Sequence, residues 1–200
     1  MEANINNQST KPDLPVIPFV SQALWEQWLD QNHAVSKGIW LQMFKKNSGI
    51  ASVNYAQALD VALCYGWIDG QLKSIDGLSY MQRFTPRRPK SIWSKRNIEH
   101  IARLITEGRM KPAGLKEAKA AKSDGRWEVA YDGQGSMKLP SDFLEELTKH
   151  SEAFIFYESL NKANKYAIAW RVQTAKRPET REKRMKEILE MLARKEKFHM

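Results

Sequence analysis

Apolar positions in the first third of the chain alternate between helical spacing and short β-type runs. Ser21 is a typical N-cap, and the apolar residues after it recur at helical spacing, which predicts a helix ending near residue 33. Residues 38–45 are aromatic and partly alternating, so they predict a strand. Asn54 caps a second predicted helix, whose apolar stripe runs to Leu63.

Turn signals follow this second helix. Gly66 suits a helix C-cap, and a strand is predicted to start at Trp67. Asp69-Gly70 can form a turn, but Asp76-Gly77 is the stronger hairpin signal, because β-type residues occupy 78–84. These runs predict a small antiparallel sheet packed with helices.

Helical spacing dominates the rest of the sequence. Ser94 and Pro112 are typical starts for a third and a fourth helix. We therefore predict an α+β fold whose parts follow one another along the chain. They are a disordered tail over 1–11, an α+β domain over 12–130, a polar linker over 131–136 and an all-helical module over 137–200.

Composition limits the class of protein. A chain of 200 residues with 42% apolar residues can fold without a disulfide or a metal. The single cysteine, Cys64, excludes an internal disulfide framework and fits a reducing compartment. No stretch approaches the ~20 apolar residues of a membrane span, and the first ten residues lack the pattern of a signal peptide. We therefore expect a cytoplasmic protein.

Positive charge is concentrated between Arg83 and Arg126. This segment holds thirteen Lys and Arg against four acids, so its net charge of +9 equals that of the whole chain. Its densest part, Arg83–Asn97, has six cations and no acid. Such a surface suits nucleic acid or a phosphorylated ligand.

The residue types of this run fit anion recognition. The guanidinium group of arginine is a rigid fork that binds phosphate or carboxylate with two hydrogen bonds. We predict that Trp93 offers an aromatic face, and that His100, between Arg96 and Arg103 on its helix, donates to an anion as a neutral ring. The competing interpretation makes Phe84 and Trp93 core anchors and the cations a solvated loop. The predicted anion-binding residues are Arg83, Arg87, Arg88, Lys90, Trp93, Lys95, Arg96 and His100.

Catalytic signatures are scarce. The sequence has no phosphate-binding loop, dinucleotide motif, zinc-protease motif or nucleophile elbow, and its four histidines lack metal-ligand spacing, so we expect neither cofactor nor metal. Asp69 and Asp76 are weak candidates for a general base, since each precedes a glycine and so has the composition of a turn. Cys64 could act as a nucleophile if a histidine approached it, but beside an apolar stripe it is more typical of a buried thiol.

Several long sequence segments resemble the bacterial YdeI/OmpD-associated family, also called bacteriocin-protection proteins. The resemblance extends from about residue 19 to residue 199. It implies a link to bacteriocin or envelope-stress tolerance, and it carries no established activity, cofactor or catalytic residue. The segments are Cys64–Gly70, Arg83–Asn97 and Gly108–Gly114, with Tyr166–Trp170 and Thr174–Arg184 similar to the helical module of that family.

Three functions remain open from the sequence. The leading hypothesis is a cytoplasmic protein that holds a polyanion or a phosphorylated ligand on its basic segment. The second is an enzyme acting on a small anionic substrate with Asp69 or Asp76 as base, beside Arg83 or Arg87. The third is a protein-interaction module built on the C-terminal helices. The sequence leaves the oligomeric state open.

Overall fold

The chain packs into two compact units. The computed structural model describes residues 14–133 and 136–199, so the predicted tail over 1–11 and residues 134–135 of the predicted linker lie outside the described residues. The first unit contains the residues up to Ser91 together with Glu99–Trp127. The second contains Ile92–Ile98 together with the residues from Glu128 onward.

A four-stranded sheet forms the centre of the first unit. Its strands are β1 (Val16–Pro18), β2 (Ile39–Phe44), β3 (Trp67–Ser74) and β4 (Ser79–Pro86), in the order β1-β2-β4-β3. Strands β2, β4 and β3 are antiparallel, as the alternating runs predict. The short β1 pairs in parallel with β2, a pairing that the proline-rich approach to the first helix did not indicate.

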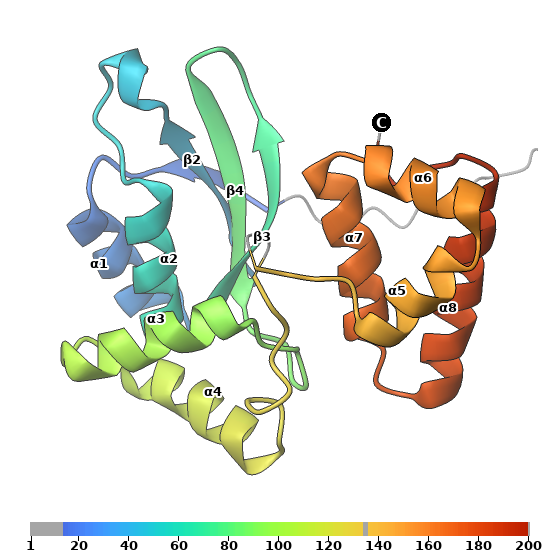
Figure 1. The fold of residues 1–200 in the computed structure, drawn as a ribbon. Helices are drawn as coiled ribbons and strands as arrows, with labels where there is room; N and C mark the ends of the chain where they lie inside the picture. The colour runs from blue at the N-terminus through green and yellow to red at the C-terminus, as the bar shows by residue number, and fades with distance from the viewer. Residues whose placement is uncertain (1–13, 134–135, 200) are drawn as a thin grey trace, which may run out of the picture. The chain divides into compact units, whose positions relative to one another are not determined.

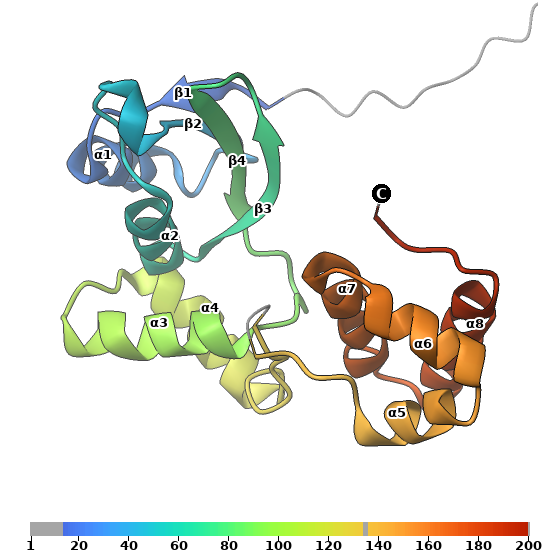
Figure 2. The same ribbon diagram turned by 45° about the horizontal axis from the view of Figure 1, so that its top comes forward.

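Helices cover one face of this sheet. Figures 1 and 2 show α1 (Gln22–Asn32) and α2 (Tyr55–Cys64) on the same side of the strands. A short 3-10 turn, η1 (Lys46–Ser48), follows β2. The core between the layers consists of fully buried side chains, among them Trp25, Leu29, Ile39, Leu41, Leu59 and Phe84.

Two further helices complete the basic segment, α3 (Lys95–Thr106) and α4 (Pro112–Ser123). Helix α4 packs closely against the end of α2 because its third residue is Gly114. A Cβ atom at that position would lie only 2.3 Å from the carbonyl oxygen of Cys64. Any side chain there would therefore separate the two helices.

Local signals in the sequence are largely confirmed. Ser21 caps α1, and Asn54 caps α2 through a capping box with Gln57. Gly66 adopts the left-handed conformation after α2, with φ 74°. The turn considered at Asp69-Gly70 is wrong, because β3 continues to Ser74 through a bulge between Asp69 and Leu72.

The second unit is mainly a helical module. Its helices α5 (Ser141–Thr148), α6 (Ser151–Ser159), α7 (Lys162–Gln173) and α8 (Pro178–Ala193) enclose a core that includes Phe143, Leu147, Ile168, Val172 and Leu192. Within the described residues, no helix is long and apolar enough to cross a membrane. The predicted α+β class with a C-terminal run of helices is confirmed.

Candidate anion-binding surface

The predicted anion-binding residues divide between the two units. Arg83, Arg87, Arg88, Lys90 and His100 belong to the first unit, and Trp93, Lys95 and Arg96 belong to the second. Lys95 forms an ion pair with Asp132 within the second unit, with 2.7 Å between Nζ and Oδ1. That hydrogen bond, with a second one from Gln173, holds the pKa of Asp132 below its usual value.

The aromatic residues of the run are core anchors. Trp93 is 1% exposed and Phe84 is fully buried. A ring enclosed in this way has no face open to a nucleotide base, so the predicted stacking role of Trp93 is wrong, and both rings are core anchors. The sequence could not separate these alternatives, because an aromatic ring in a basic run suits a core as well as a ligand.

Two of the predicted arginines are also buried or half-buried in the first unit. Arg87 is 7% exposed and donates weakly to Ser91 Oγ over 3.4 Å. Arg83 is half-buried in β4, opposite Trp40 of β2 in the strand register. Its Nε hydrogen is buried and has no hydrogen-bond partner among the described residues.

The loop after β4 carries two exposed cations, Arg88 and Lys90. Neither side chain makes an ion pair or a hydrogen bond with any described residue. The loop is held from the far end of the basic segment by Arg126, which is buried and donates to the carbonyl oxygen of Ser91 over 3.0 Å. Arg126 itself is fixed by Asp124, with 2.8 Å from Nε to Oδ1. The loop cations therefore lie near the turn that follows α4.

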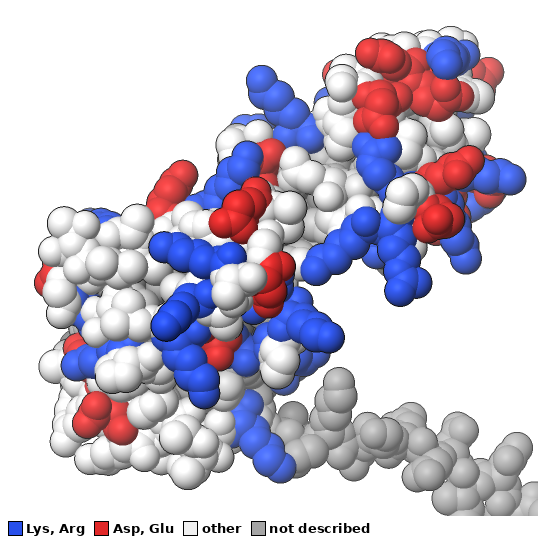
Figure 3. All heavy atoms as spheres, turned by 90° about the horizontal axis from the view of Figure 1, so that it is seen from below, with Lys and Arg blue, Asp and Glu red and all other residues white. Residues whose placement is uncertain are grey.

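Helix α4 presents more unpaired charge. Lys116 and Lys119 are exposed, lie one turn apart on the same face, and make no ion pair within the described part of the chain. Lys122, in the next turn, lies over the ring of Trp127 at 4.9 Å from its centroid. Figure 3 shows Lys and Arg side chains gathered on one face of the first unit, with acidic side chains interspersed among them.

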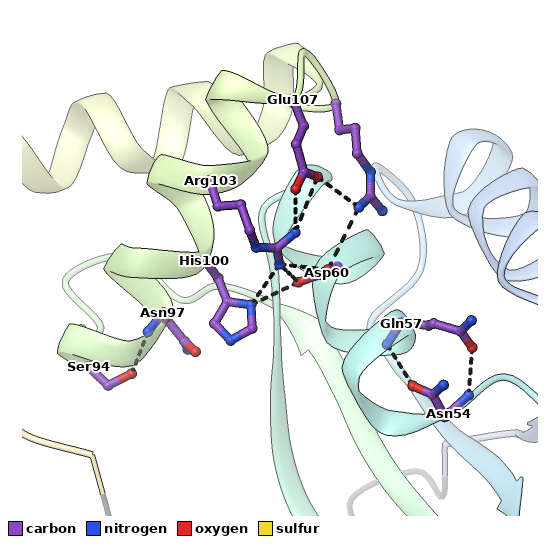
Figure 4. A network of polar contacts seen from close by, with 9 residues as sticks. Asn54, Gln57, Asp60, Ser94, Asn97, His100, Arg103 and Glu107 are labelled. Atoms are coloured by element: carbon purple, nitrogen blue, oxygen red, sulfur yellow. Dashed lines mark hydrogen bonds and ion pairs between the residues drawn. The ribbon is translucent and has the colours of Figure 1, made fainter. Parts of the chain in front are cut away.

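Arg103 of α3 and the cations of the turn after it are instead paired with acids. Figure 4 shows Asp60 of α2 facing His100 and Arg103 of α3. Arg103 Nη2 donates to both Asp60 oxygens, at 2.6 and 2.7 Å, and its Nη1 donates to Glu107 Oε1 at 2.9 Å. Arg109 donates to the second oxygen of Glu107 at 3.2 Å. Lys111 pairs with Glu26 of α1 at 3.3 Å.

The carboxylate of Asp60 accepts the hydrogen bonds that hold this cluster together. Burial pushes the pKa of Asp60 up, but hydrogen bonds from Arg103 and His100 outweigh it and hold the pKa below its usual value. An ionised carboxylate only accepts hydrogen bonds, so the Nδ1 of His100, 2.8 Å from Oδ1, carries a hydrogen and donates. Hydrogen bonds from Arg103 and then Arg109 likewise lower the pKa of Glu107.

The prediction for His100 needs correction. Its ring does not stand in a purely cationic row available to an anion, because Asp60 occupies its Nδ1 and also binds Arg103. Asp60 was missed by the sequence reasoning. The available signal was a single carboxylate within the apolar stripe of α2, between Leu59 and Val61. A charge so placed must find a partner, and the basic segment supplies it.

The two candidate bases do not form a catalytic pair. Asp76 lies at the exposed hairpin tip and accepts hydrogen bonds from the backbone of Leu78 and Ser79, which lower its pKa. Asp69 accepts a 2.8 Å hydrogen bond from the Tyr55 hydroxyl on the helix-covered side of the sheet. Asp69 is opposite Phe84 in the register, so Arg83, the next residue of β4, points to the other face.

Cys64 does not offer a reactive nucleophile near neutral pH. Cys64 is buried, and burial raises the pKa of its thiol to about 11, so the reactive thiolate is scarce near neutral pH. Among the described residues, no group of three or more His, Cys, Asp and Glu side chains is arranged to hold a metal ion.

Two family models match separate parts of the chain. Residues 136–195, which include α5 to α8, match the family described as Bacteriocin-protection, YdeI or OmpD-Associated. Residues 17–117 match a domain of unknown function (DUF8412), and this match includes the N-terminal segments that carried part of the resemblance. The searches of curated proteins and of solved structures gave no match. The chain thus belongs to the DUF8412 family, and its C-terminal helices are similar to the family described as Bacteriocin-protection, YdeI or OmpD-Associated.

Proposed function

We propose that the protein binds nucleic acid through an unpaired basic surface on its first unit, made of Arg88, Lys90, Lys116 and Lys119. The observation that carries the proposal is the lack of acidic partners for these four exposed side chains among the described residues. Cations that serve the fold, such as Arg103 and Arg126, are each held by a carboxylate. Unpaired like charges repel one another, and a polyanion removes that repulsion.

The layout of these cations supports a polymer as the ligand. Lys116 and Lys119 are separated by one helical turn, a rise of about 4.5 Å. Arg126 ties the loop that carries Arg88 and Lys90 to the turn after α4. We infer that the charges continue along an open surface, which can follow a phosphate backbone.

The proposed mode of binding is electrostatic and tolerant of sequence. Trp93 and Phe84 are buried, so the aromatic stacking that would add to affinity is missing at these two positions. Affinity would then depend on the release of counterions and fall steeply with salt. A nucleic-acid partner would also place the protein in the cytoplasm.

Fluorescence anisotropy with labelled single-stranded DNA, single-stranded RNA and duplex DNA at about 50 mM salt tests the proposal. The test variant changes Arg88, Lys90, Lys116 and Lys119 to Gln. The matched control changes four exposed lysines elsewhere (Lys37, Lys46, Lys138 and Lys176) to Gln, which removes the same charge.

We expect the test variant to bind at least ~100-fold more weakly than the wild type, and the control variant less than ~5-fold more weakly. Equal losses in the two variants would mean that net charge alone matters and that the surface has no special role. Absence of binding to all three probes by the wild type would reject nucleic acid as the ligand.

A further inference from the structure

The second unit contains a groove between α6 and the segment that follows α8. Two adjoining cavities, of about 310 and 340 Å³, share Phe156, Ser159 and Lys195 in their walls. Asn161, Asn164 and Lys197 line the first cavity, and Glu152 and Ile155 line the second. Volumes of this size suit a small molecule.

One wall of the groove is apolar and open. Ile155 is 69% exposed, although it lies on a helix whose other side packs into the core through Ala153 and Tyr157. Phe156 is only partly buried against that core. The fold does not require Ile155 to be apolar, so its side chain is available to an apolar ligand.

The opposite rim is cationic. Lys195 and Lys197 are exposed and make no ion pair within the described residues. Lys195 has a left-handed backbone with φ 57°, at the end of α8, a position where glycine would be free of strain. The side chain of this strained residue lines both cavities. Glu152 is the acid in the lining, and it contributes to the second cavity only.

The segment that carries these lysines is fixed in place. Asn164 is 1% exposed, and its side chain donates to the carbonyl oxygen of His199 at 3.1 Å and accepts from the amide of the same residue at 2.9 Å. The guanidinium group of Arg171 lies over the Phe198 ring, 4.4 Å from its centroid. With α8 at one end and Asn164 at the other, the rim keeps a defined position over the groove.

We propose that this groove binds a small apolar carboxylic acid. The hydrocarbon part would cover Ile155 and Phe156, and the carboxylate would meet the ammonium groups of Lys195 and Lys197. An uncharged apolar molecule would leave the two ammonium groups without a partner, and a nucleic acid would leave the apolar wall uncovered. The inference is independent of the nucleic-acid proposal, because it concerns the other unit.

Titration of the ¹⁵N-labelled full chain with phenylacetate, followed by amide chemical shifts, tests the inference. Phenylacetamide has the same shape without the charge and serves as the matched ligand control. We expect phenylacetate to shift the amides of residues 155–161 and 195–197 with a dissociation constant on the order of 1 mM, and phenylacetamide to bind at least ~10-fold more weakly. Equal binding of acid and amide, or shifts located elsewhere, would overturn the inference.

Substitution separates a binding role of Lys195 from a structural one. Lys195→Gly removes the ammonium group and also relieves the strained backbone, so the melting temperature should stay equal or rise while phenylacetate binds at least ~5-fold more weakly. Lys197→Gln should weaken binding as well, and the control Lys176→Gln should leave it unchanged. Unaltered binding in both rim variants would overturn the inference even if Lys195→Gly changed stability.

A comparison with a peptide tests whether the bound carboxylate belongs to a small molecule or to a peptide C-terminus. A hexapeptide with a free C-terminal phenylalanine is compared with phenylacetate under the same conditions. If phenylacetate binds at least as strongly per heavy atom as the hexapeptide, the result supports a small-molecule ligand. Binding of the peptide without binding of phenylacetate would overturn that assignment in favour of a peptide terminus.

Discussion

Helices α3 and α4 both belong to the basic segment, but their cations make different contacts. On α3 and the turn after it, Arg103 and Arg109 meet Asp60 and Glu107, and the cluster ties α3 to α2. On α4, Lys116 and Lys119 meet no acid within the described residues. The charge of Arg103 is therefore part of the fold, whereas Lys116 and Lys119 carry exposed charge that has no acidic partner among the described residues.

This difference shows how to interpret a basic segment. Net charge measures how many cations a segment has, whereas function depends on how many stay unpaired after folding. Acids that lie far away in the sequence, such as Asp60, decide that number. Four changes of sequence or condition, taken from the largest expected effect to the smallest, test the comparison.

The strongest change is Gly114→Ala, which would push α4 away from α2. Because a Cβ atom would meet the Cys64 and Leu63 carbonyl oxygens at 2.3 and 2.6 Å, we expect a loss of about 3 kcal/mol or more in the free energy of unfolding. Urea unfolding followed by tryptophan fluorescence measures it. Gly77→Ala is the control, since a Cβ there meets nothing within 4 Å and should change stability little. A mild effect at Gly114 would mean that α4 is not seated on α2 as described.

Asp60→Asn removes the carboxylate that pairs with the cations of α3. Arg103 and His100 would lose a charged acceptor, and we expect about 2 kcal/mol of destabilisation at pH 7. Glu99→Gln, on an exposed acid of α3 without an ion pair among the described residues, should cost almost nothing. Urea unfolding of the two variants at the same pH gives the comparison, and equal stability of the two would contradict the structural role of Asp60.

The pH dependence of this effect has a fixed sign. The pKa of Asp60 is lower in the folded state than in the unfolded state, where it is about 4. Its stabilisation is therefore present above pH ~4 and is lost as the pH falls through the lower, folded-state pKa. Unfolding curves of wild type and Asp60→Asn measured over decreasing pH should converge in acid. A difference that persists unchanged at low pH would show that the carboxylate charge is not the cause.

The double variant with Lys116→Gln and Lys119→Gln should have the smallest effect on stability. Both side chains are exposed and unpaired, so we expect the free energy of unfolding to change by no more than about 0.5 kcal/mol. Thermal melting measures this directly. A larger loss would reveal a partner for these lysines and would place them with the structural cations of α3.

Local chemistry allowed much of the fold to be predicted from the sequence. The caps at Ser21 and Asn54 and the Asp76-Gly77 hairpin follow from preferences of single residues, and the structure has all of them. The parallel pairing of β1 depends on a partner strand more than twenty residues away, and three residues carry too little pattern to specify it.

The candidate site was less predictable than the fold. Residue type identified Arg87 and Trp93 as ligand-binding groups, yet the structure buries both side chains. Arg88 is the same residue type as Arg87 and is its neighbour in the sequence, yet it is exposed. Exposure and pairing are properties of the folded chain, and no local pattern in one sequence encodes them.

The slope of the logarithm of nucleic-acid affinity against the logarithm of salt concentration tests the central claim most directly. If Arg88, Lys90, Lys116 and Lys119 each neutralise a phosphate, their joint replacement by Gln should reduce the magnitude of the slope on single-stranded DNA by about 3. The variant with the four exposed lysines elsewhere replaced should keep the wild-type slope. Equal slopes for all three proteins would contradict the claim that the unpaired basic surface is where the polyanion binds.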